Sequence, residues 1–548
     1  MFHAALTSAA GALLLTLLLA AVPPQPRGAF ATGSYRNLFA EAGHSAQESR
    51  AKIEAAFRQL FQGDPSTQAL YYAVGSNANG PLAYILDPVH HDVRSEGLSY
   101  GMMIAVQLDK KGEFDALWNW ARTYMYHSRG PAQGFFSWSA KTDGKPNDEM
   151  PAPDGEEYFA TSLYFAAARW GNGAGICNYK AEADRLLTDM LHRAEATGPT
   201  MAGPRTSGPL FDAAHKMVRF SPVLGDARNT DDGGHTDPSY HLPAFYELWA
   251  RWGPEADRAF WVQAAAASRE FFEKAAHPST GLAPEYAAFD GAPWAAEFNK
   301  VSADFAFDSW RTAMNWSVDW AWWAADPREQ KRSDRLQAFF ESQGPNYANH
   351  FTLDGRPLNK DHSDGLTAMN AVVSLAATQP RARAFVEALW NMRIPSGEWR
   401  YYDGMLYMLA LLHCGGEFRI WGPGGGSDEA LDAAAKRLAA VSTFAFGGVG
   451  YAGVISKGEI DFKFVLSQSA PAALASFEQL YASGNPQAKA YALAGIKKLS
   501  LSRYKELLAI TAASTDQVEV MRGCIVTHEP LRKVARAIDG DQFRLSLR

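Results

Sequence analysis

The sequence predicts an all-α protein built on an (α/α)6 barrel, followed by a small, mostly helical C-terminal module. Period-3.6 patterns indicate twelve helical segments before residue 420 and few convincing strands. The segments alternate between patterns with one charged face and patterns that are apolar nearly all round. Because a helix that is apolar on every face is buried on every face, this alternation indicates an outer and an inner ring.

Each expected helix is assigned to a ring by its pattern. Charged faces mark outer helices, as in 180–187, and apolar or aromatic runs mark inner helices, as in 101–106. An α-solenoid shares this alternation, but its repeats are regular in length and these spacings are not. Five long connections lead into inner helices, so the starts of the inner helices and the long loops share one face. In chain order the expected helices are 47–62, 95–108, 111–126, 155–171, 178–195, 236–252, 256–275, 307–325, 327–342, 361–377, 380–393 and 401–415.

The N-terminus is typical of a secreted or periplasmic protein. An apolar run over 12–22 is followed by two prolines and by small residues at Ala29 and Ala31, which suit a signal peptidase, so a signal peptide is expected over 1–31. No other stretch approaches the ~20 apolar residues that a membrane span needs. We therefore expect no membrane span after the signal is removed.

A change in composition separates the C-terminus from the barrel. The barrel is expected over 32–421 and a Gly-rich linker over 422–428. Residues 429–548 contain no Trp and are richer in Ala, Ser and Lys, with helical patterns near 428–440, 470–482, 485–497 and 502–511. This segment is interpreted as a separate helical module, and its sequence indicates neither a function nor a partner.

Composition excludes several classes of protein. The 548 residues are 47% hydrophobic, which is too apolar for a disordered chain. Nucleic acid is not expected as a partner, because Lys+Arg 52 are outnumbered by Asp+Glu 59 and form no basic run. The three cysteines, Cys177, Cys414 and Cys524, lie far apart and belong to no Cys/His cluster. We therefore expect no disulfide framework, no metal and no cofactor.

Acidic residues stand at the start of all six inner helices. Capping explains any one of them, since orphan amides and the helix dipole favour carboxylates there. Six acidic helix starts at one end of a barrel would repel one another by more than capping returns, which points to a functional site. The residues are Glu96, Asp154, Asp237, Asp308, Asp361 with Asp364, and Asp403.

Paired carboxylates among aromatic residues suit glycoside hydrolysis. One acid protonates the leaving oxygen, and a second carboxylate activates water or attacks carbon. A helix dipole favours the charged form of the acid by ~0.3–1 kcal/mol, which is less than one pKa unit. Burial and a neighbouring carboxylate raise a carboxyl pKa by as much as ~3–5 units, so a protonated Glu near neutral pH is physically reasonable.

Three motifs in the same order resemble glycoside hydrolase family 8. Residues 93–103 (VRSEGLSYGMM) look like the segment around that family's general acid, and 307–312 (FDSWRT) like the segment around its general base. Residues 151–159 (PAPDGEEYF) resemble the third acidic element, and the similarity covers roughly 35–421. The resemblance implies an (α/α)6 barrel, an inverting mechanism and no metal.

Carried over to this sequence, the resemblance makes Glu96 the proton donor and Asp308 the general base. Asp154 would bind the distorted sugar next to the scissile bond, and Arg311 would be the partner of Asp308. Inversion leaves room for a water, so the Glu96 and Asp308 carboxyls are expected roughly 6.5–9.5 Å apart. Other substrate-binding residues are expected to be Tyr100, Trp138, Glu157, Tyr240, His362 and Tyr402.

Within the family, 91–97 and 154–160 look most like the reducing-end xylose-releasing exo-oligoxylanases. In those enzymes a loop and a His close one end of the cleft, and His362 lies in the matching region. The resemblance thus implies xylose release from the reducing end of β-1,4-linked xylo-oligosaccharides.

Other functions remain open. Endo-acting β-1,4-glucanases, xylanases and chitosanases share the barrel and differ in their loops. A polysaccharide lyase on a similar toroid acts on an anionic substrate, which the acidic mouth disfavours. In a non-catalytic carbohydrate-binding protein the acids would only cap helices.

Overall fold

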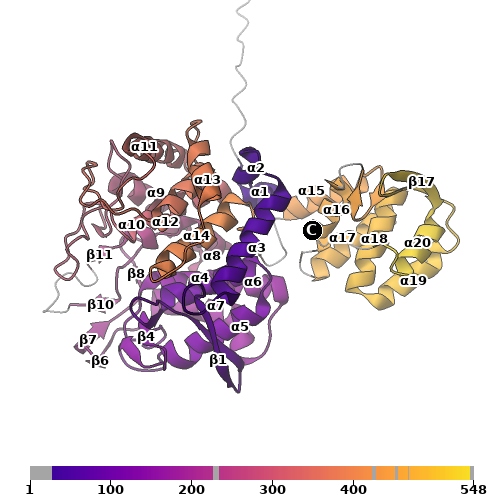
Figure 1. Cartoon of the computed structure of the whole chain (residues 1–548). Coiled ribbons are helices and arrows are strands. Elements are labelled where there is room, and N and C mark those ends of the chain that lie inside the picture. The colour runs from indigo at the N-terminus through magenta and orange to yellow at the C-terminus, as the bar shows by residue number, and fades with distance from the viewer. Residues whose placement is uncertain are drawn as a thin grey trace, which may run out of the picture.

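A computed structural model describes residues 27–225, 234–422, 428–450, 454–466, 468 and 470–543. Six helices form the inner ring of a barrel, in which each helix contacts the next and the last contacts the first (Figure 1). This closed ring confirms the predicted (α/α)6 barrel. The inner helices are α4 (Ser95–Gln107), α6 (Pro153–Trp170), α8 (Pro243–Trp252), α10 (Ser309–Trp323), α12 (Asp364–Val372) and α14 (Arg400–Cys414).

The outer ring consists of helices that, except for α5, bury one face each. In α7, for example, Ala183, Leu186, Leu187 and Met190 are buried, and this spacing places them on one side of the helix. A capping box between Ser45 and Glu48 fixes the start of the first outer helix. The outer helices are α3 (Ala46–Gln62), α5 (Lys111–Trp120), α7 (Tyr179–His192), α9 (Arg258–Ala275), α11 (Arg328–Gln343) and α13 (Ala382–Asn391).

The sixth predicted helix starts later than expected. Instead of beginning at 236, α8 begins at Pro243. The residues before it form strand β11 (His235–Thr236) and a 3-10 turn over Pro238–Tyr240. Proline lacks the amide that a helix interior needs, so Pro238 and Pro243 are each confined to a first turn. As a result, 236–242 form the end of a strand and a 3-10 turn ahead of α8 in place of its expected first turns.

Short strands in the long connections border the same face. The three-stranded sheet in the order β3-β4-β5 leads directly into α4, because Arg94 pairs with Ser139 and α4 begins one residue later. Strands β11 and β12 pair with Thr236 opposite Ala287. The strands of the barrel domain are β1 (Tyr71–Asn77), β2 (Gly80–Ile85), β3 (Asp92–Arg94), β4 (Ser139–Lys141), β5 (Pro146–Asp148), β6 (Ala196–Thr200), β7 (Gly203–Ser207), β8 (Phe211–Asp212), β9 (Met217–Val218), β10 (Val223–Leu224), β11 and β12 (Ala287–Ala288).

The C-terminal module has a hydrophobic core of its own, separate from that of the barrel. Besides the four expected helices it contains two more and a three-stranded sheet in the order β13-β16-β17. Strand β13 pairs parallel with β16, and β16 forms an antiparallel hairpin with β17. Its elements are α15 (Asp428–Ala439), β13 (Phe444–Ala445), β14 (Gly448–Val449), β15 (Val454–Ile455), α16 (Lys457–Leu466), α17 (Ala470–Ser483), α18 (Pro486–Leu499), α19 (Leu501–Thr511), β16 (Gln517–Arg522), β17 (Ile525–Pro530) and α20 (Leu531–Asp539).

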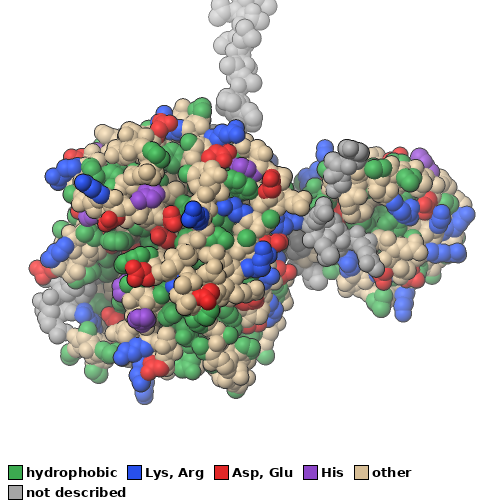
Figure 2. All heavy atoms as spheres, viewed as in Figure 1, with side chains coloured by type: hydrophobic (Ala, Val, Ile, Leu, Met, Phe, Trp, Pro, Cys, Tyr) green, Lys and Arg blue, Asp and Glu red, His purple; other side chains and the backbone are tan. Residues whose placement is uncertain are grey.

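An N-terminal segment connects the two units. Helix α1 (Ala29–Thr32) contacts both α10 of the barrel and α15 of the module, and α2 (Leu38–Glu41) follows it (Figure 1). Most of the expected signal peptide and of the Gly-rich linker lies outside the described residues. Within the described residues, no helix is long and apolar enough to cross a membrane. Acidic and basic side chains are interspersed over the face of the barrel seen in Figure 2.

Candidate active site

One buried arginine bridges three carboxylates at the mouth of the barrel. Nη1 of Arg311 donates hydrogen bonds to Oε2 of Glu96 and to Oδ2 of Asp154, both at 2.8 Å. Nη2 of the same side chain donates to Oδ1 of Asp308 at 2.7 Å. The three acids come from the starts of α4, α6 and α10, so convergence of the inner helices assembles the cluster that the sequence predicted.

Exposure divides these four residues into two layers. The side chains of Arg311 and Asp154 are 1% and 5% exposed, whereas those of Glu96 and Asp308 are 15% and 27% exposed. The two outer carboxylates therefore face the cleft, and the two inner groups hold them from behind. Glu96 and Asp308 bind different amino nitrogens of the guanidinium, so their carboxyl groups remain apart.

Local backbone geometry places the acid and the base. The amide of Ser95 donates to the carbonyl of Trp138 at 3.0 Å, which fixes the start of α4 just before Glu96. A Cβ on Gly155 would lie 2.6 Å from Oγ of Ser95, so only glycine lets α6 approach α4 this closely. On the opposite side, Phe307 has a φ of 34°, a strained conformation for a non-glycine residue that costs ~1–3 kcal/mol. This strained residue directly precedes Asp308.

Three tyrosines add hydrogen bonds to the cluster. The hydroxyl of Tyr401 donates to Oε1 of Glu96 at 2.8 Å. The hydroxyl of Tyr100 accepts from Nη1 of Arg311 at 2.6 Å. Tyr402 donates to the carbonyl of Phe307 at 3.1 Å and lies 3.5 Å from Oδ1 of Asp308. Helix α14 thus contacts both the proposed acid and the proposed base through adjacent residues.

The electrostatics of the site favour a protonated Glu96. Burial is the largest influence and raises the pKa of Glu96 to about 7, with the charges of Asp154 and Asp308 adding to the rise. The positive charge of Arg311 acts in the opposite direction. Burial also raises the pKa of Asp154, against the same guanidinium. Glu96 therefore holds a proton at a pH at which an ordinary Glu has lost it.

The cleft in front of these carboxylates has a volume of about 420 Å³. Trp138 and Phe298 line it with rings that are 36% and 51% exposed, and Tyr240 and Tyr286 line it as well. Exposed rings beside a few polar groups are typical of sugar-binding clefts, because the apolar face of a sugar stacks on an aromatic ring.

The structure brings some of the expected substrate-binding residues to the cleft and leaves others behind it. Trp138 and Tyr240 line the cleft, and Tyr402 contacts the base. Tyr100 is 2% exposed and lies behind the cleft, against Arg311. Glu157 is fully buried and accepts a hydrogen bond from Tyr246 at 2.6 Å, so it faces the barrel wall.

His362 is exposed at the start of α12, but the fold already uses its ring. Its Nδ1 lies 3.0 Å from the carbonyl of Tyr347, and its Nε2 lies 3.2 Å from Oγ1 of Thr367. To hydrogen-bond a sugar hydroxyl, the ring would have to give up one of these partners. The role expected for His362 at the reducing end therefore remains a prediction.

Two further carboxyl groups beside Asp308 had no assigned role in the sequence. Asp237 and Glu285 are 0% and 4% exposed, and each has one buried oxygen without a hydrogen bond among the described residues. Burial, reinforced by the charge of Asp308, raises the pKa of Glu285 to about 8 and the pKa of Asp237 well above its usual range. Asp237 was recognisable only as a helix-start acid. Glu285 lies in a long loop, where no periodic pattern marks it.

Comparisons with known proteins agree with this geometry. The family model described as glycosyl hydrolases family 8 matches residues 85–208 and 213–416. The chain is 42% identical over 397 residues to the reducing-end xylose-releasing exo-oligoxylanase Rex8A of Paenibacillus barcinonensis, covering 72% of this chain and 99% of that protein. Two crystal structures from Teredinibacter turnerae, a GH8 xylobiose complex and a xylohexaose complex of a catalytic mutant xylanase, are 56% and 55% identical. Both have a TM-score of 0.71 and match 72% of this chain and 100% of theirs.

Proposed function

Because the chain belongs to glycosyl hydrolases family 8, we propose that it hydrolyses β-1,4-linked xylo-oligosaccharides with inversion and releases xylose from their reducing end. The observation that carries the proposal is the arrangement of Glu96 and Asp308. They face one cleft from two amino nitrogens of Arg311, and Glu96 is buried enough to stay protonated.

The proposed reaction uses these two carboxyls in one concerted step. Glu96 gives its proton to the glycosidic oxygen as the bond between that oxygen and the anomeric carbon breaks. A water on the opposite face of the sugar attacks the anomeric carbon, and Asp308 takes a proton from it. The carboxyl groups of inverting enzymes are ~6.5–9.5 Å apart, which leaves room for that water.

Arg311 positions both groups for this step. Its Nη2 bond orients the Asp308 carboxylate, which must be charged to accept a proton. Its Nη1 bond to Glu96 is shared with Asp154, whose negative charge offsets part of the influence of the arginine on the acid. One cation can therefore hold a base and an acid at neighbouring positions.

The substrate and the exo mode are supported by relatives. Three curated relatives at 36–42% identity carry the name reducing-end xylose-releasing exo-oligoxylanase. A cleft lined with aromatic rings around buried carboxyls suits a neutral pentose chain.

A second candidate is an endo-acting xylanase. It is favoured by the higher identity, 55%, to the Teredinibacter turnerae structure described as a xylanase in complex with xylohexaose. The hydrogen bonds of His362 favour it as well, because both ring nitrogens already have partners and are not free to recognise a reducing-end hydroxyl.

Product analysis separates these functions. The full chain is incubated with xylotriose, xylan, soluble β-glucan and chitosan, and NMR identifies the anomer of each new end. Xylose release from the reducing end of xylotriose, with inversion and little attack on polymer, supports the exo-oligoxylanase. Rapid internal cleavage of xylan would replace it with the endo-xylanase. Glu96→Gln is the control, and hydrolysis that persists in this variant would remove Glu96 from the role of acid.

We also propose that the protein is exported, to the periplasm or the medium, with signal cleavage upstream of Gly28. The apolar run over 12–22 supports export. Cleavage after 31 would remove most of α1, yet Ala29 is 4% exposed and α1 packs on α10. Cell fractionation with N-terminal sequencing of the mature chain tests both points. A mature chain that begins at Thr32, or one retained in the cytoplasm, would contradict the proposal.

A further inference from the structure

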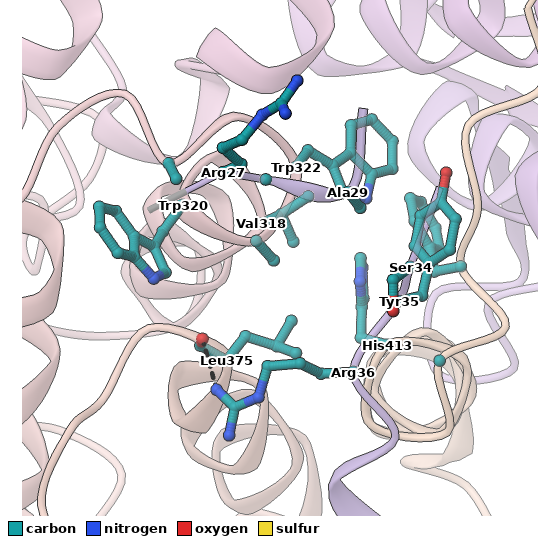
Figure 3. A pocket seen from close by; sticks show the side chains of 15 residues that line it. Arg27, Ala29, Ser34, Tyr35, Arg36, Val318, Trp320, Trp322, Leu375 and His413 are labelled. Carbon is teal, nitrogen blue, oxygen red and sulfur yellow. Dashed lines mark hydrogen bonds between the residues drawn. The ribbon is translucent and has the colours of Figure 1, made fainter. Parts of the chain in front are cut away.

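A second pocket lies at the closed end of the barrel, away from the catalytic cleft. Its volume is about 150 Å³. The last turns of α10 and α14 form one side, and the N-terminal segment over 27–36 covers the other (Figure 3). On α14, His413 of this pocket is twelve residues after Tyr401 of the active site, a separation of about 18 Å along a helix. The pocket is therefore distinct from the cleft.

His413 contributes an unused polar group to this pocket. The residue is 5% exposed, and its ring stacks on Phe418 with centroids 3.9 Å apart. Neither ring nitrogen has a hydrogen bond to any of the described residues, and Figure 3 shows the ring projecting among the lining side chains. A buried polar group without a hydrogen-bond partner is unfavourable, so a ligand in the pocket would satisfy this imidazole.

The charge of the pocket points to a neutral ligand. Burial lowers the pKa of His413 to about 3, so the ring is uncharged and offers one donor and one acceptor. No carboxylate occurs among the described residues that line the pocket, which disfavours a cation. Arg36 is already engaged, since it bonds both oxygens of Glu41 and the carbonyls of Ser374 and Leu375. Arg27, the other guanidinium of the lining, also has a partner, so an anion would find no unengaged guanidinium on either arginine.

Size and lining narrow the ligand class. A cavity of ~150 Å³ holds a single six-membered ring. The walls include Val318, Trp322 and Leu375, which suit an apolar ring face, and Ser34 and Tyr35 line the same pocket. The hydroxyl of Tyr35 already accepts a hydrogen bond from the amide of Ile420 at 2.9 Å. We propose that this pocket binds one neutral polyhydroxylated ring of pentose size.

Xylose is the natural probe for the pocket, and that choice rests on the proposed function, whereas the ligand class rests on the pocket alone. Calorimetry with xylose is performed on the full chain carrying Glu96→Gln, which removes turnover. We expect two xylose molecules per chain, one in the cleft and one at His413. Crystals of the same variant soaked in xylose should show a sugar ring within hydrogen-bond distance of His413.

Two further substitutions assign the second site. His413→Leu removes the imidazole and should weaken that site at least about fivefold, the effect of one or two lost hydrogen bonds. Ala321→Phe fills the pocket with His413 intact and should abolish the site. Ala325→Phe is the matched control on an exposed neighbour that does not line the pocket, and it should leave both sites unchanged.

The outcomes separate this inference from the proposed function. One xylose per chain, unaffected by either pocket substitution, would overturn the inference, as would soaked crystals that show only water at His413. Displacement of xylose by inorganic phosphate would overturn the neutral ligand class. If calorimetry finds one xylose per chain and Ala321→Phe abolishes that binding, the result would support the pocket and would count against the cleft as a xylose site. Hydrolysis of xylotriose by the chain with its native Glu96 tests the proposed function independently.

Discussion

Glu96 combines two demands that usually conflict in a carboxyl group. It must hold a proton to act as an acid, yet it lies within hydrogen-bond distance of a guanidinium, which favours its charged form. Burial outweighs that influence and leaves its pKa at about 7. The acid works only while protonated, so activity must fall as the pH rises through this value. We expect the alkaline limb of kcat/KM against pH, which reports the free enzyme, near pH 7.

The measurement is a pH profile on xylotriose with buffers of constant ionic strength. An alkaline limb close to 4.5, the ordinary value for Glu, would show that the site does not retain the proton and would contradict the electrostatic argument. If the residual activity of Glu96→Gln still showed a limb near pH 7, that limb would belong to another group.

Tyr401 also affects the pKa of Glu96, through the carboxyl oxygen that does not contact Arg311. Its hydroxyl donates to Oε1 of Glu96, and a hydrogen bond to a charged group is worth ~1.5–3 kcal/mol. Because this bond favours the charged form, Tyr401→Phe should move the alkaline limb upward by about one pH unit. Tyr407→Phe on the same helix is the control, since the buried Tyr407 hydroxyl makes no hydrogen bond with any described residue. A downward shift in Tyr401→Phe, or an equal shift in both variants, would contradict this role.

At the residue scale, sequence reasoning recovered the groups carried by short motifs. Glu96, Asp154, Asp308 and Arg311 meet as expected, because each stands within the first turn of an inner helix or just before it. The position of Glu157 was not predictable in this way. Glu157 follows Asp154 by three residues, so it lies on nearly the same face of the helix but about 4.5 Å further along the axis, where it meets Tyr246 instead of the cleft.

At the scale of helices, the separation between α4 and α14 decides whether Tyr401 reaches the acid. A Cβ on Gly97 would lie 2.7 Å from the ring and the hydroxyl of Tyr401, and that ring is only 3% exposed. Alanine at this position must therefore displace the tyrosine or the helix. We expect Gly97→Ala to destabilise the fold by ~1–3 kcal/mol and to lower kcat markedly.

Denaturant unfolding and steady-state kinetics measure the two effects. Gly112→Ala is the matched control in helix α5, where a Cβ would meet nothing within 4 Å. It should be neutral or stabilise by ~0.4–1 kcal/mol through the unfolded chain. Equal stability and activity for the two alanine variants would show that close packing at Gly97 is not required.

Helices that bury a continuous stripe were predictable, and irregular segments were not. All twelve barrel helices occur, because the 3.6-residue period reports burial directly. The predicted start of α8 was wrong because two prolines convert a helical pattern into a strand and a turn. In the module, α16 and the sheet were missed because their segments of two to ten residues give little periodic signal. Helix α20 was missed although Leu531, Val534 and Ile538 form a buried stripe at helical spacing.

For the whole molecule, the two separate hydrophobic cores indicate that the barrel does not depend on the module for its fold. Their contact runs through α1 and α15, and among the described residues none that lines the cleft belongs to the module. A chain ending at Gly422 should therefore keep kcat and KM on xylotriose within about twofold and unfold in a single transition. The full chain should show a second transition from the module.

Loss of activity on the oligosaccharide, with the truncated chain still folded by circular dichroism, would mean that the module supports the site through α1. If the full and the truncated chain act equally on xylotriose but differ on insoluble xylan, the module affects where the enzyme is located and not the chemistry of its active site.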